Sequence, residues 1–300
     1  ISAVEQTNIT IRGGGTIDGN SHHFLTTPET GDAFLPKQKL TWRPGQMVFL
    51  CECTDVHIEQ VHLNHAPYWT VLLHGCEQVT IRDVRIQNRY DTPNGDGIDI
   101  DCCRNVAISG CLIESGDDCI TLRANTEPLK NPRPCEHITV TGCVLKTPRC
   151  QAIRVGVGDG VIRHAVFSGL TISDTFCGLN IHSSYTPSSH GATIENIRFE
   201  NIAFQNVRQP IRITPGYASE ETGIRDICYR GLSGLVTGTS LLSGSESVRP
   251  ENISIGDVDF RYPEEMAGQV ALKAERVDGL RIENFRTTPP LEIHGNESTP

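Results

Sequence analysis

Acidic residues recur at matching points of two neighbouring segments of this chain. Segment 94–101 reads Asn-Gly-Asp-Gly-Ile-Asp-Ile-Asp, and segment 116–123 reads Gly-Asp-Asp-Cys-Ile-Thr-Leu-Arg. Carboxyl groups held close together can act as a general acid and a general base, the pairing that hydrolysis of a glycosidic bond requires. We therefore take Asp96, Asp117 and Asp118 as the candidate catalytic residues. The competing interpretation is that Asp and Asn at these points only cap turns.

Both segments belong to a repeat that must position them. Within each unit apolar and polar residues alternate at period 2, which indicates strands, and Gly, Asn, Asp and Ser interrupt the units. A period between 20 and 50 residues indicates a solenoid. We predict an all-β fold, a single-stranded right-handed parallel β-helix of about nine or ten coils. The apolar residues that mark successive units are Val56, Val79, Val106, Ile138, Ala165, Ile197, Ile227, Ile253 and Leu280.

The alternation also predicts which side chains leave the core. In 98–101 the isoleucines should point inward, which sends Asp99 and Asp101 outward, and in 120–123 the same pattern sends Arg123 outward. Asp96 and Asp118 then lie at matching strand starts one coil apart. Carboxyl groups this close cannot all ionise freely, so the pKa of at least one should be raised, as a general acid requires.

Composition is consistent with one elongated domain. The net charge of −10, without a Lys/Arg-rich face, argues against a nucleic-acid partner. No apolar run approaches 18 residues, which argues against a membrane span. A solenoid extends its core along an axis, so residues 1–300 can form a single β-helix domain. Residues 19–46 are too many for one turn and should form a loop excursion beside the groove.

The twelve cysteines follow the repeat. Residues at the same position of successive coils stack, so we expect inward ladders of free thiols; the alternative is a disulfide framework. No Cys-x-x-Cys or His-x-x-x-His pair is present, and no metal site is predicted from them. The two expected ladders are Cys53, Cys76, Cys103 and Cys135, and Cys111 and Cys143.

From the turn at 13–19 to about Tyr217 the chain resembles glycoside hydrolase family 28, the polygalacturonase family. The motifs that carry the resemblance are 94–99 and 116–119, with Arg-Pro at 43–44 and Ala-Pro-Tyr-Trp-Thr at 66–70. The resemblance implies a pectin-lyase-like solenoid and an inverting hydrolase of a pectin-type or related polysaccharide or oligosaccharide, without cofactor or metal. It further implies that Asp117 is the acid and that Asp96 and Asp118 position and deprotonate water. It also implies a secreted or periplasmic protein, although reduced cysteines are compatible with the cytoplasm.

The chain departs from the family pattern at two points. Gln151 stands where the family has the His of Gly-His-Gly, and Asn180 and His182 replace the two cations of the family's Arg-Ile-Lys, which holds a uronate carboxylate. We therefore expect specificity to differ from that for plain polygalacturonate, with rhamnogalacturonan as one example.

Other cations lie nearby in the predicted groove. Arg123 and Arg154 should face outward on adjacent coils, either to hold a substrate carboxylate or to neutralise the aspartates. Tyr217 is a candidate for the wall of the groove, and His74 is expected to face outward one coil before Asp101. The candidate substrate-binding residues are Asn94, Asp99, Asp101, Arg123, Gln151, Arg154, Asn180, His182, Tyr217 and His74.

Two rival functions use the same residues. In a polysaccharide lyase or epimerase, Asp96, Asp117 and Asp118 would hold Ca²⁺ and Arg154 would take the proton. In a non-catalytic carbohydrate-binding β-helix, the groove would bind a glycan without turnover. Formation of an unsaturated product would identify a lyase, and binding without release of reducing ends would identify a binding module.

Overall fold

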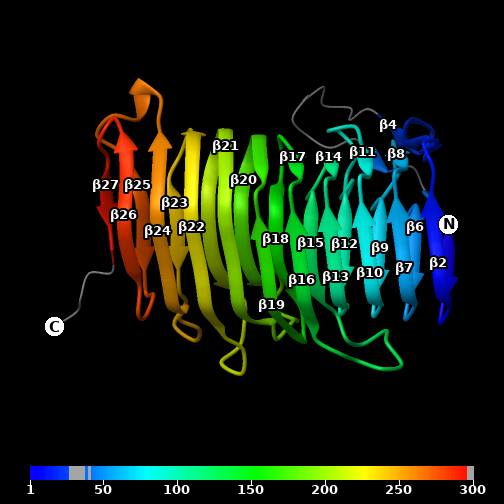
Figure 1. Cartoon of the computed structure of the whole chain (residues 1–300). Coiled ribbons are helices and arrows are strands. Elements are labelled where there is room, and N and C mark those ends of the chain that lie inside the picture. The colour runs from blue at the N-terminus through cyan, green and yellow to red at the C-terminus, as the bar shows by residue number, and fades with distance from the viewer. Residues whose placement is uncertain (27–37, 40–41, 296–300) are drawn as a thin grey trace.

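The computed structural model describes residues 1–26, 38–39 and 42–295. Figure 1 shows a stack of parallel strands that runs from the N-terminus to the C-terminus. Twenty-five strands form one continuous sheet, in which every neighbouring pair is parallel. The predicted all-β, right-handed parallel β-helix is confirmed.

Three columns of strands run the length of the solenoid. From β20 onward, several strands continue around corners and contribute to two or three columns. The groove column contains β1 (Ser2–Val4), β6 (Val48–Cys51), β9 (Val71–His74), β12 (Ile98–Asp101), β15 (Ile120–Ala124), β18 (Gln151–Gly158), the later parts of β20 (Thr171–Ser184) and β21 (Thr193–Gly216), β23 (Ser240–Ser243), β25 (Val270–Glu275) and β27 (Glu292–His294). The second column contains β2 (Thr7–Arg12), β7 (Thr54–Glu59), β10 (Glu77–Arg82), β13 (Arg104–Ser109), β16 (Cys135–Thr141), β19 (Val161–Ser168), the first part of β21, β22 (Ile224–Val236), β24 (Glu251–Arg261) and β26 (Arg281–Thr288). The third column contains β3 (Thr16–Asp18), β8 (His62–Asn64), β11 (Arg85–Gln87), β14 (Leu112–Glu114), β17 (Val144–Lys146), the first part of β20, the middle of β21 and the later parts of β22, β24 and β26.

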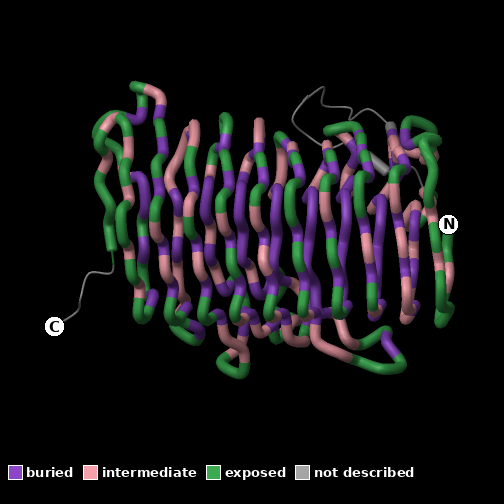
Figure 2. The backbone as a smooth tube through the Cα atoms, in the orientation of Figure 1, coloured by how far each residue is buried: buried purple, intermediate pink, exposed green. Residues whose placement is uncertain are grey.

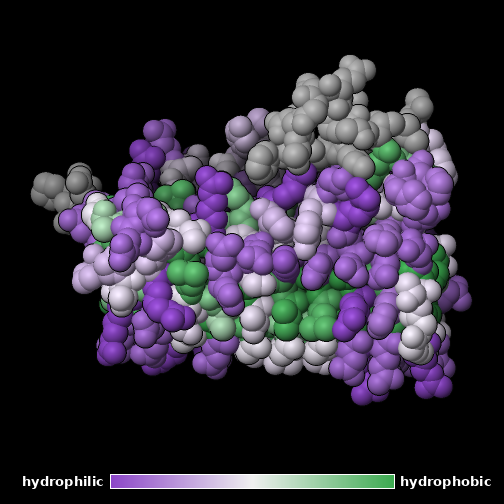
Figure 3. Space-filling model, turned by 90° about the horizontal axis from the view of Figure 1, so that it is seen from above, coloured by the Kyte–Doolittle hydropathy of each residue, from purple (hydrophilic) through white to green (hydrophobic). Residues whose placement is uncertain are grey.

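The apolar residues that marked the repeat lie in register along the second column. Val79 is opposite both Val56 and Val106, and the ladder continues without a break to Ile253. Ile9 adds one earlier step, opposite Val56. These side chains form one continuous core inside the coils, and Figure 2 shows buried positions recurring in the coils between the two ends of the solenoid. Seen from above, the outer surface is mostly hydrophilic with short apolar stretches (Figure 3).

Two turns of each coil depend on left-handed backbone. Gly, Asn and Asp adopt a positive φ with the least strain, and they occupy most of these positions. The residue before each ladder residue has positive φ at Asn8, Asp55, Gln78, Asn105, His137, His164, Asn196, Asp226 and Asn252. The fourth residue after each ladder residue has positive φ at Gly13, Gln60, Asp83, Gly110, Gly142, Gly169, Asn201, Gly231 and Asp257. Polar side chains also bond between coils, as where Asn252 donates to Asp226.

The cysteine prediction is confirmed. Cys53, Cys76, Cys103 and Cys135 are all buried at corresponding positions of successive coils, and the backbone N–H of Cys76 donates to Cys103 Sγ at 3.2 Å. All twelve cysteines are free, nine of them buried and three partly so. The ladders therefore contribute small apolar side chains to the core.

The described part of the 19–46 excursion contains a 3₁₀ turn, η1 (Ser21–His23), and an antiparallel pair, β4 (Leu25–Thr26) with β5 (Gln38–Lys39). Residues 27–37 and 40–41 lie outside the described residues. A second 3₁₀ turn, η2 (Glu264–Met266), precedes β25. Among the described residues, neither helical turn has the length or apolarity needed to cross a membrane.

Candidate active site

Two aspartates of the cluster are brought together by the stacking of adjacent coils. Asp96 precedes β12 and Asp118 precedes β15, and the N–H of Gly97 donates to the carbonyl of Asp118 at 2.8 Å. A Cβ at Gly97 would lie only 2.4 Å from the carbonyl oxygen of Cys119, so a side chain there would force the coils apart. Glycine at this position permits the close approach of the two acidic turns.

Asp118 is completely buried and both its oxygens have partners. Oδ2 accepts from Arg154 Nη1 at 2.8 Å, and Oδ1 accepts from the N–H of Gln151 at 3.1 Å. Asp117, one residue earlier, is only partly buried. The two neighbours therefore differ: Asp118 is fixed by a cation and a backbone donor, and Asp117 faces a more open environment.

Arg123 joins the carboxylates of the preceding coil. Its Nε donates to Oδ1 of Asp99 at 2.7 Å, and its Nη2 donates to Oδ2 of Asp96 at 3.3 Å. The second oxygen of each aspartate is buried and has no hydrogen-bond partner in the described part of the chain. Arg123 thus offsets part of the negative charge, and acceptor atoms remain for a ligand or water.

Burial and mutual repulsion raise the pKa values of this cluster. The pKa of Asp96 is well above its ordinary value because the group is buried and Asp99, Asp117 and Asp118 repel its charge. Burial, with the charge of Asp118, also raises the pKa of Asp117. Burial raises the pKa of Asp99 to about 6, although Arg123 acts in the opposite direction. The cluster therefore retains protons at pH values where isolated aspartates are ionised.

A row of polar side chains crosses successive coils beside the cluster. Asp99 is in register with Thr121, Thr121 with Arg154, Arg154 with Asn180, and Asn180 with Arg212. Each of these side chains has a buried polar atom without a hydrogen-bond partner among the described residues. Buried donors and acceptors normally have partners, so this row, which we call the polar row, has the character of a ligand-binding surface.

Two arginines of the polar row place positive charge on either side of Asn180. Arg154 and Arg212 stand one coil to either side of Asn180, and the buried Nε of each is unpartnered, as is Nη2 of Arg154. Sequence reasoning missed Arg212. Its position in the repeat could have identified it, because Arg212 occupies the same point of its coil as Asn180 does.

Aromatic rings lie over the guanidinium groups of Arg123 and Arg154. The centroid of the Trp69 ring is 4.4 Å from Cζ of Arg123, and that of Tyr185 is 3.8 Å from Cζ of Arg154. The Tyr185 ring covers Arg154, which is why this outward-facing member of the polar row is only 6% exposed. The sequence analysis does not predict Trp69 or Tyr185 as site residues, although Trp69 belongs to segment 66–70, which contributes to the family resemblance.

His182 lies on β20 two residues after Asn180, and Tyr217 follows the end of β21. His182 packs edge-on against Tyr185, with ring centroids 4.4 Å apart. Burial, together with Arg154 and Arg212, lowers the pKa of His182 to about 4, so its ring is neutral at pH 7. Tyr217 is 60% exposed, and its N–H donates to the carbonyl of Ser184.

Asp101 and His74 are placed away from the carboxylate cluster. Asp101 accepts from the N–H of Asn125 at 2.7 Å and from its Nδ2 at 2.6 Å, and His74 Nε2 lies 2.8 Å from the Asn125 carbonyl oxygen. Both side chains are nearly fully buried. The alternation predicted their outward direction, but the turn after β15 covers them, so these contacts hold that turn instead of facing an open groove.

Asn94 connects the excursion to the site. Its Oδ1 accepts from Arg43 Nη2 at 2.9 Å, and Arg43 Nη1 donates to the carbonyl of Pro93 at 2.7 Å. Arg43 also lies over the Tyr68 ring, which stacks on Trp69. The end of the excursion is thus anchored to the turn that precedes Asp96.

Two groups of described residues have the spacing of metal ligands. One is Asp117, Asp118 and Cys150, and the other is His74, Asp101 and Cys102. Ca²⁺ takes oxygen ligands, but each group includes a thiol, and in the first both Asp118 oxygens already accept hydrogen bonds. These donor sets do not fit the calcium site that a lyase mechanism would need.

Comparison with known proteins links this chain to one family. Residues 1–275 match the family described as glycosyl hydrolases family 28. The chain is 25% identical over 223 residues to polygalacturonase QRT2 of Arabidopsis thaliana, covering 70% of this chain and 45% of that protein. A polygalacturonase of Juniperus ashei is also 25% identical, over 232 residues, which are 72% of this chain and 43% of that protein. The chain spans about half the length of these curated relatives.

A solved structure has the same fold over nearly the whole chain. The hyperthermoactive exopolygalacturonase of Thermotoga maritima superposes with a TM-score of 0.78 at 21% identity, covering 99% of this chain and 71% of that one. At this identity the likeness describes the fold alone.

Proposed function

The chain belongs to glycosyl hydrolase family 28, and on that premise we propose that it hydrolyses a glycosidic bond of a pectin-type polysaccharide or oligosaccharide by direct displacement with water. The observation that supports this most strongly is the cluster of Asp96, Asp117 and Asp118 at the starts of adjacent strands. Inverting hydrolysis needs one protonated carboxyl group and one carboxylate that activates water.

In this proposal Asp117 is the general acid. It is the least buried of the three aspartates, and burial and the charge of Asp118 raise its pKa. A proton retained at mildly acidic pH can be donated to the leaving oxygen.

Asp118 and Asp96 then act on the water. Arg154 and the Gln151 N–H fix the Asp118 carboxylate, while Asp96 retains an unpartnered oxygen that can accept a proton from water. Because burial raises the pKa of Asp96, this step requires a pH high enough to ionise it. Arg123 stabilises that ionised form through its contact with Asp96.

The polar row supports an acidic sugar as part of the substrate. Unpartnered N–H groups of Arg154 and Arg212 are donors suited to a carboxylate, and guanidinium groups bind carboxylates well. The cations stand on both sides of Asn180, not at Asn180 and His182. We infer that a uronate is held in an orientation different from that imposed by Arg-Ile-Lys, so that specificity moves away from plain polygalacturonate, for example towards rhamnogalacturonan.

The test is product analysis by mass spectrometry, with NMR for the anomeric configuration, on polygalacturonate, rhamnogalacturonan and neutral pectic oligosaccharides. Wild type should release reducing ends of inverted anomeric configuration from at least one acidic glycan, and Asp117→Asn should not. An unsaturated product would identify a lyase instead. Binding without release of reducing ends from any glycan would identify a carbohydrate-binding protein.

A further inference from the structure

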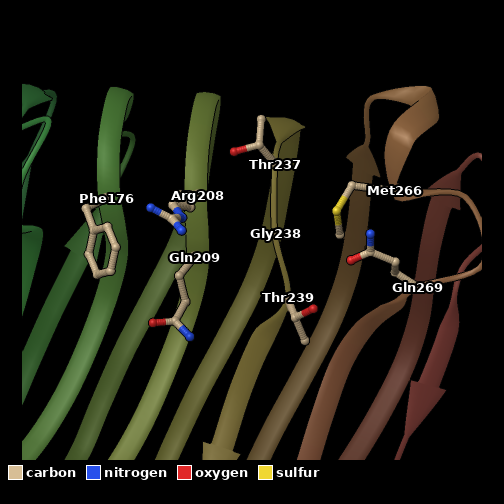
Figure 4. A pocket seen from close by; sticks show the side chains of 8 residues that line it. All are labelled: Phe176, Arg208, Gln209, Thr237, Gly238, Thr239, Met266 and Gln269. Carbon is tan, nitrogen blue, oxygen red and sulfur yellow. The ribbon is translucent and has the colours of Figure 1, made fainter.

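A second depression opens on the C-terminal side of the carboxylate cluster and shares no residue with it. Its volume is about 320 Å³. Figure 4 shows Phe176 and Arg208 on one side of it and Met266 and Gln269 on the other. Its lining residues are Phe176, Arg208, Gln209, Thr237, Gly238, Thr239, Met266 and Gln269.

The depression is aligned with the cluster along the solenoid axis. Asp118 accepts from the backbone of Gln151, Gln151 is in register with Cys177, and Cys177 is in register with Gln209. Gln209 therefore lies three coils beyond Asp118, or roughly 14 Å at the usual spacing between strands. The polar row ends at Arg212, on the same strand, β21, as Arg208. A glycan lying along the polar row would be directed towards the depression.

The lining combines an apolar base with polar edges. Phe176 and the buried Met266 provide apolar surface, while Gln209, Thr239 and Gln269 provide hydrogen-bonding groups. A Cβ at Gly238 would lie 2.3 Å from the carbonyl oxygen of Arg208, so the wall carries no side chain at that point. Sugars present both apolar C–H faces and hydroxyl groups, and a lining of this kind can contact both.

Arg208 gives the depression a charge preference. Its guanidinium lies 5.4 Å from the centroid of the Phe176 ring, and no carboxylate of the described residues forms an ion pair with it. The chain as a whole carries a net charge of −10, so an exposed arginine without a carboxylate partner is a local reversal of sign. A guanidinium in this state favours a carboxylate ligand.

We propose that this depression is a distal subsite for an acidic sugar of the same glycan chain that the carboxylate cluster cleaves, an inference that rests on the proposed function. Arg208 binds the sugar carboxylate, Phe176 and Met266 contact its C–H face, and Gln209 and Gln269 bind its hydroxyl groups.

The test measures affinity against chain length by calorimetry. The probes are two series, oligogalacturonates and rhamnogalacturonan oligosaccharides, each from the dimer to the hexamer, bound to the Asp117→Asn variant so that they stay intact. The hexamer should bind about tenfold or more tightly than the trimer, since one charge-assisted hydrogen bond contributes about that factor. Arg208→Ala and, separately, Gln269→Ala should reduce the affinity of the hexamer relative to that of the trimer. Neither substitution should change the affinity for the dimer, which serves as an internal reference.

Arg198→Ala is the matched control, because Arg198 is also an exposed arginine of β21 but pairs with Glu200 outside the depression. The proposal is overturned if hexamer and trimer bind equally in both series, if neither series binds, or if Arg208→Ala and Arg198→Ala behave alike. Release of reducing ends by the wild type is scored separately. Hydrolysis without the length effect rejects only the subsite, and an Arg208-dependent length effect without hydrolysis rejects only the proposed function.

Discussion

Nη1 of Arg154 lies 2.8 Å from Oδ2 of Asp118, while Nε and Nη2 of the same guanidinium have no partner. The two interpretations of Arg154, charge neutralisation and carboxylate recognition, therefore use different atoms of one group. Arg212 presents an unpartnered Nε one coil beyond Asn180, and no ion pair joins it to the described carboxylates. The two arginines can be separated experimentally for that reason.

We expect Arg212→Ala to lower kcat/KM for an acidic substrate about 10- to 100-fold more than for its carboxyl-reduced counterpart, because a lost charge-assisted hydrogen bond costs about 1.5–3 kcal/mol. Arg154→Ala should lower kcat/KM for both substrates, since Asp118 also loses its cationic partner. The decrease should be larger for the acidic substrate. Steady-state kinetics on the substrate pair checks this. Equal penalties on both substrates from both variants would show that neither arginine binds the sugar carboxylate.

Each of Asp96→Asn, Asp117→Asn and Asp118→Asn should lower turnover by at least about 10²-fold, because each removes an acid or base function. Asp226→Asn makes the same chemical change at an exposed turn far from the groove, where Asn tolerates the positive φ, and should retain activity. Circular dichroism verifies that the variants are folded. Near-normal turnover in any two of the three groove variants would refute the catalytic assignment.

Stability should depend on pH through Asp96. Its pKa in the folded protein is raised above the ordinary value of 3.8, so the folded state holds this proton more tightly than the unfolded chain does. The resulting stability is present below about pH 4 and is lost as the pH rises through the folded-state pKa. Asp96→Asn should therefore unfold at higher denaturant concentration than wild type near pH 7, and the advantage should shrink at low pH. A difference independent of pH would contradict the raised pKa.

The cysteine ladders predict the outcome of thiol titration. Nine cysteines are buried, so the native protein should react slowly with a thiol reagent, mainly at Cys51, Cys150 and Cys228. After denaturation all twelve should react. Rapid labelling of most thiols in the native protein, or thiols missing after unfolding, would be incompatible with free interior ladders.

A pH–rate profile tests whether the cluster needs one protonated and one ionised carboxyl group. Activity should fall at low pH, where Asp96 and Asp117 both hold protons, and at high pH, where both are ionised. Because the charge of Asp117 also raises the pKa of Asp96, each limb of the profile belongs to the pair and not to one residue. The measurement is kcat against pH for wild type, with Asp226→Asn as the control. A rate that increases steadily with pH would exclude an essential protonated carboxyl group.

The sequence was most informative where a rule repeats in each coil. The apolar ladder from Val56 to Ile253 follows from strand alternation and turn residues, both of which are local, and it places Asp96 and Asp118 side by side. Arg212 was missed because insertions between coils make its register with Asn180 hard to count from sequence alone.

Other parts of the site depend on contacts between distant segments. Alternation predicts that Asp101 points outward, but only the folded turn at Asn125 shows that it is covered. The aromatic cover by Trp69 and Tyr185, and the attachment of Arg43 to Asn94, join segments whose separation in sequence carries no periodic signal.

The two series of left-handed turns have an evolutionary consequence. Because each coil contains its own turn residues, a duplication or deletion of one whole coil preserves the backbone pattern on either side. A coil gained between Gly158 and Phe176 would leave the aspartates unchanged and move the distal depression outward by about 4.8 Å. Relatives could thus acquire a preference for longer or shorter glycans by changing their number of coils, without any substitution among the groups that break the bond.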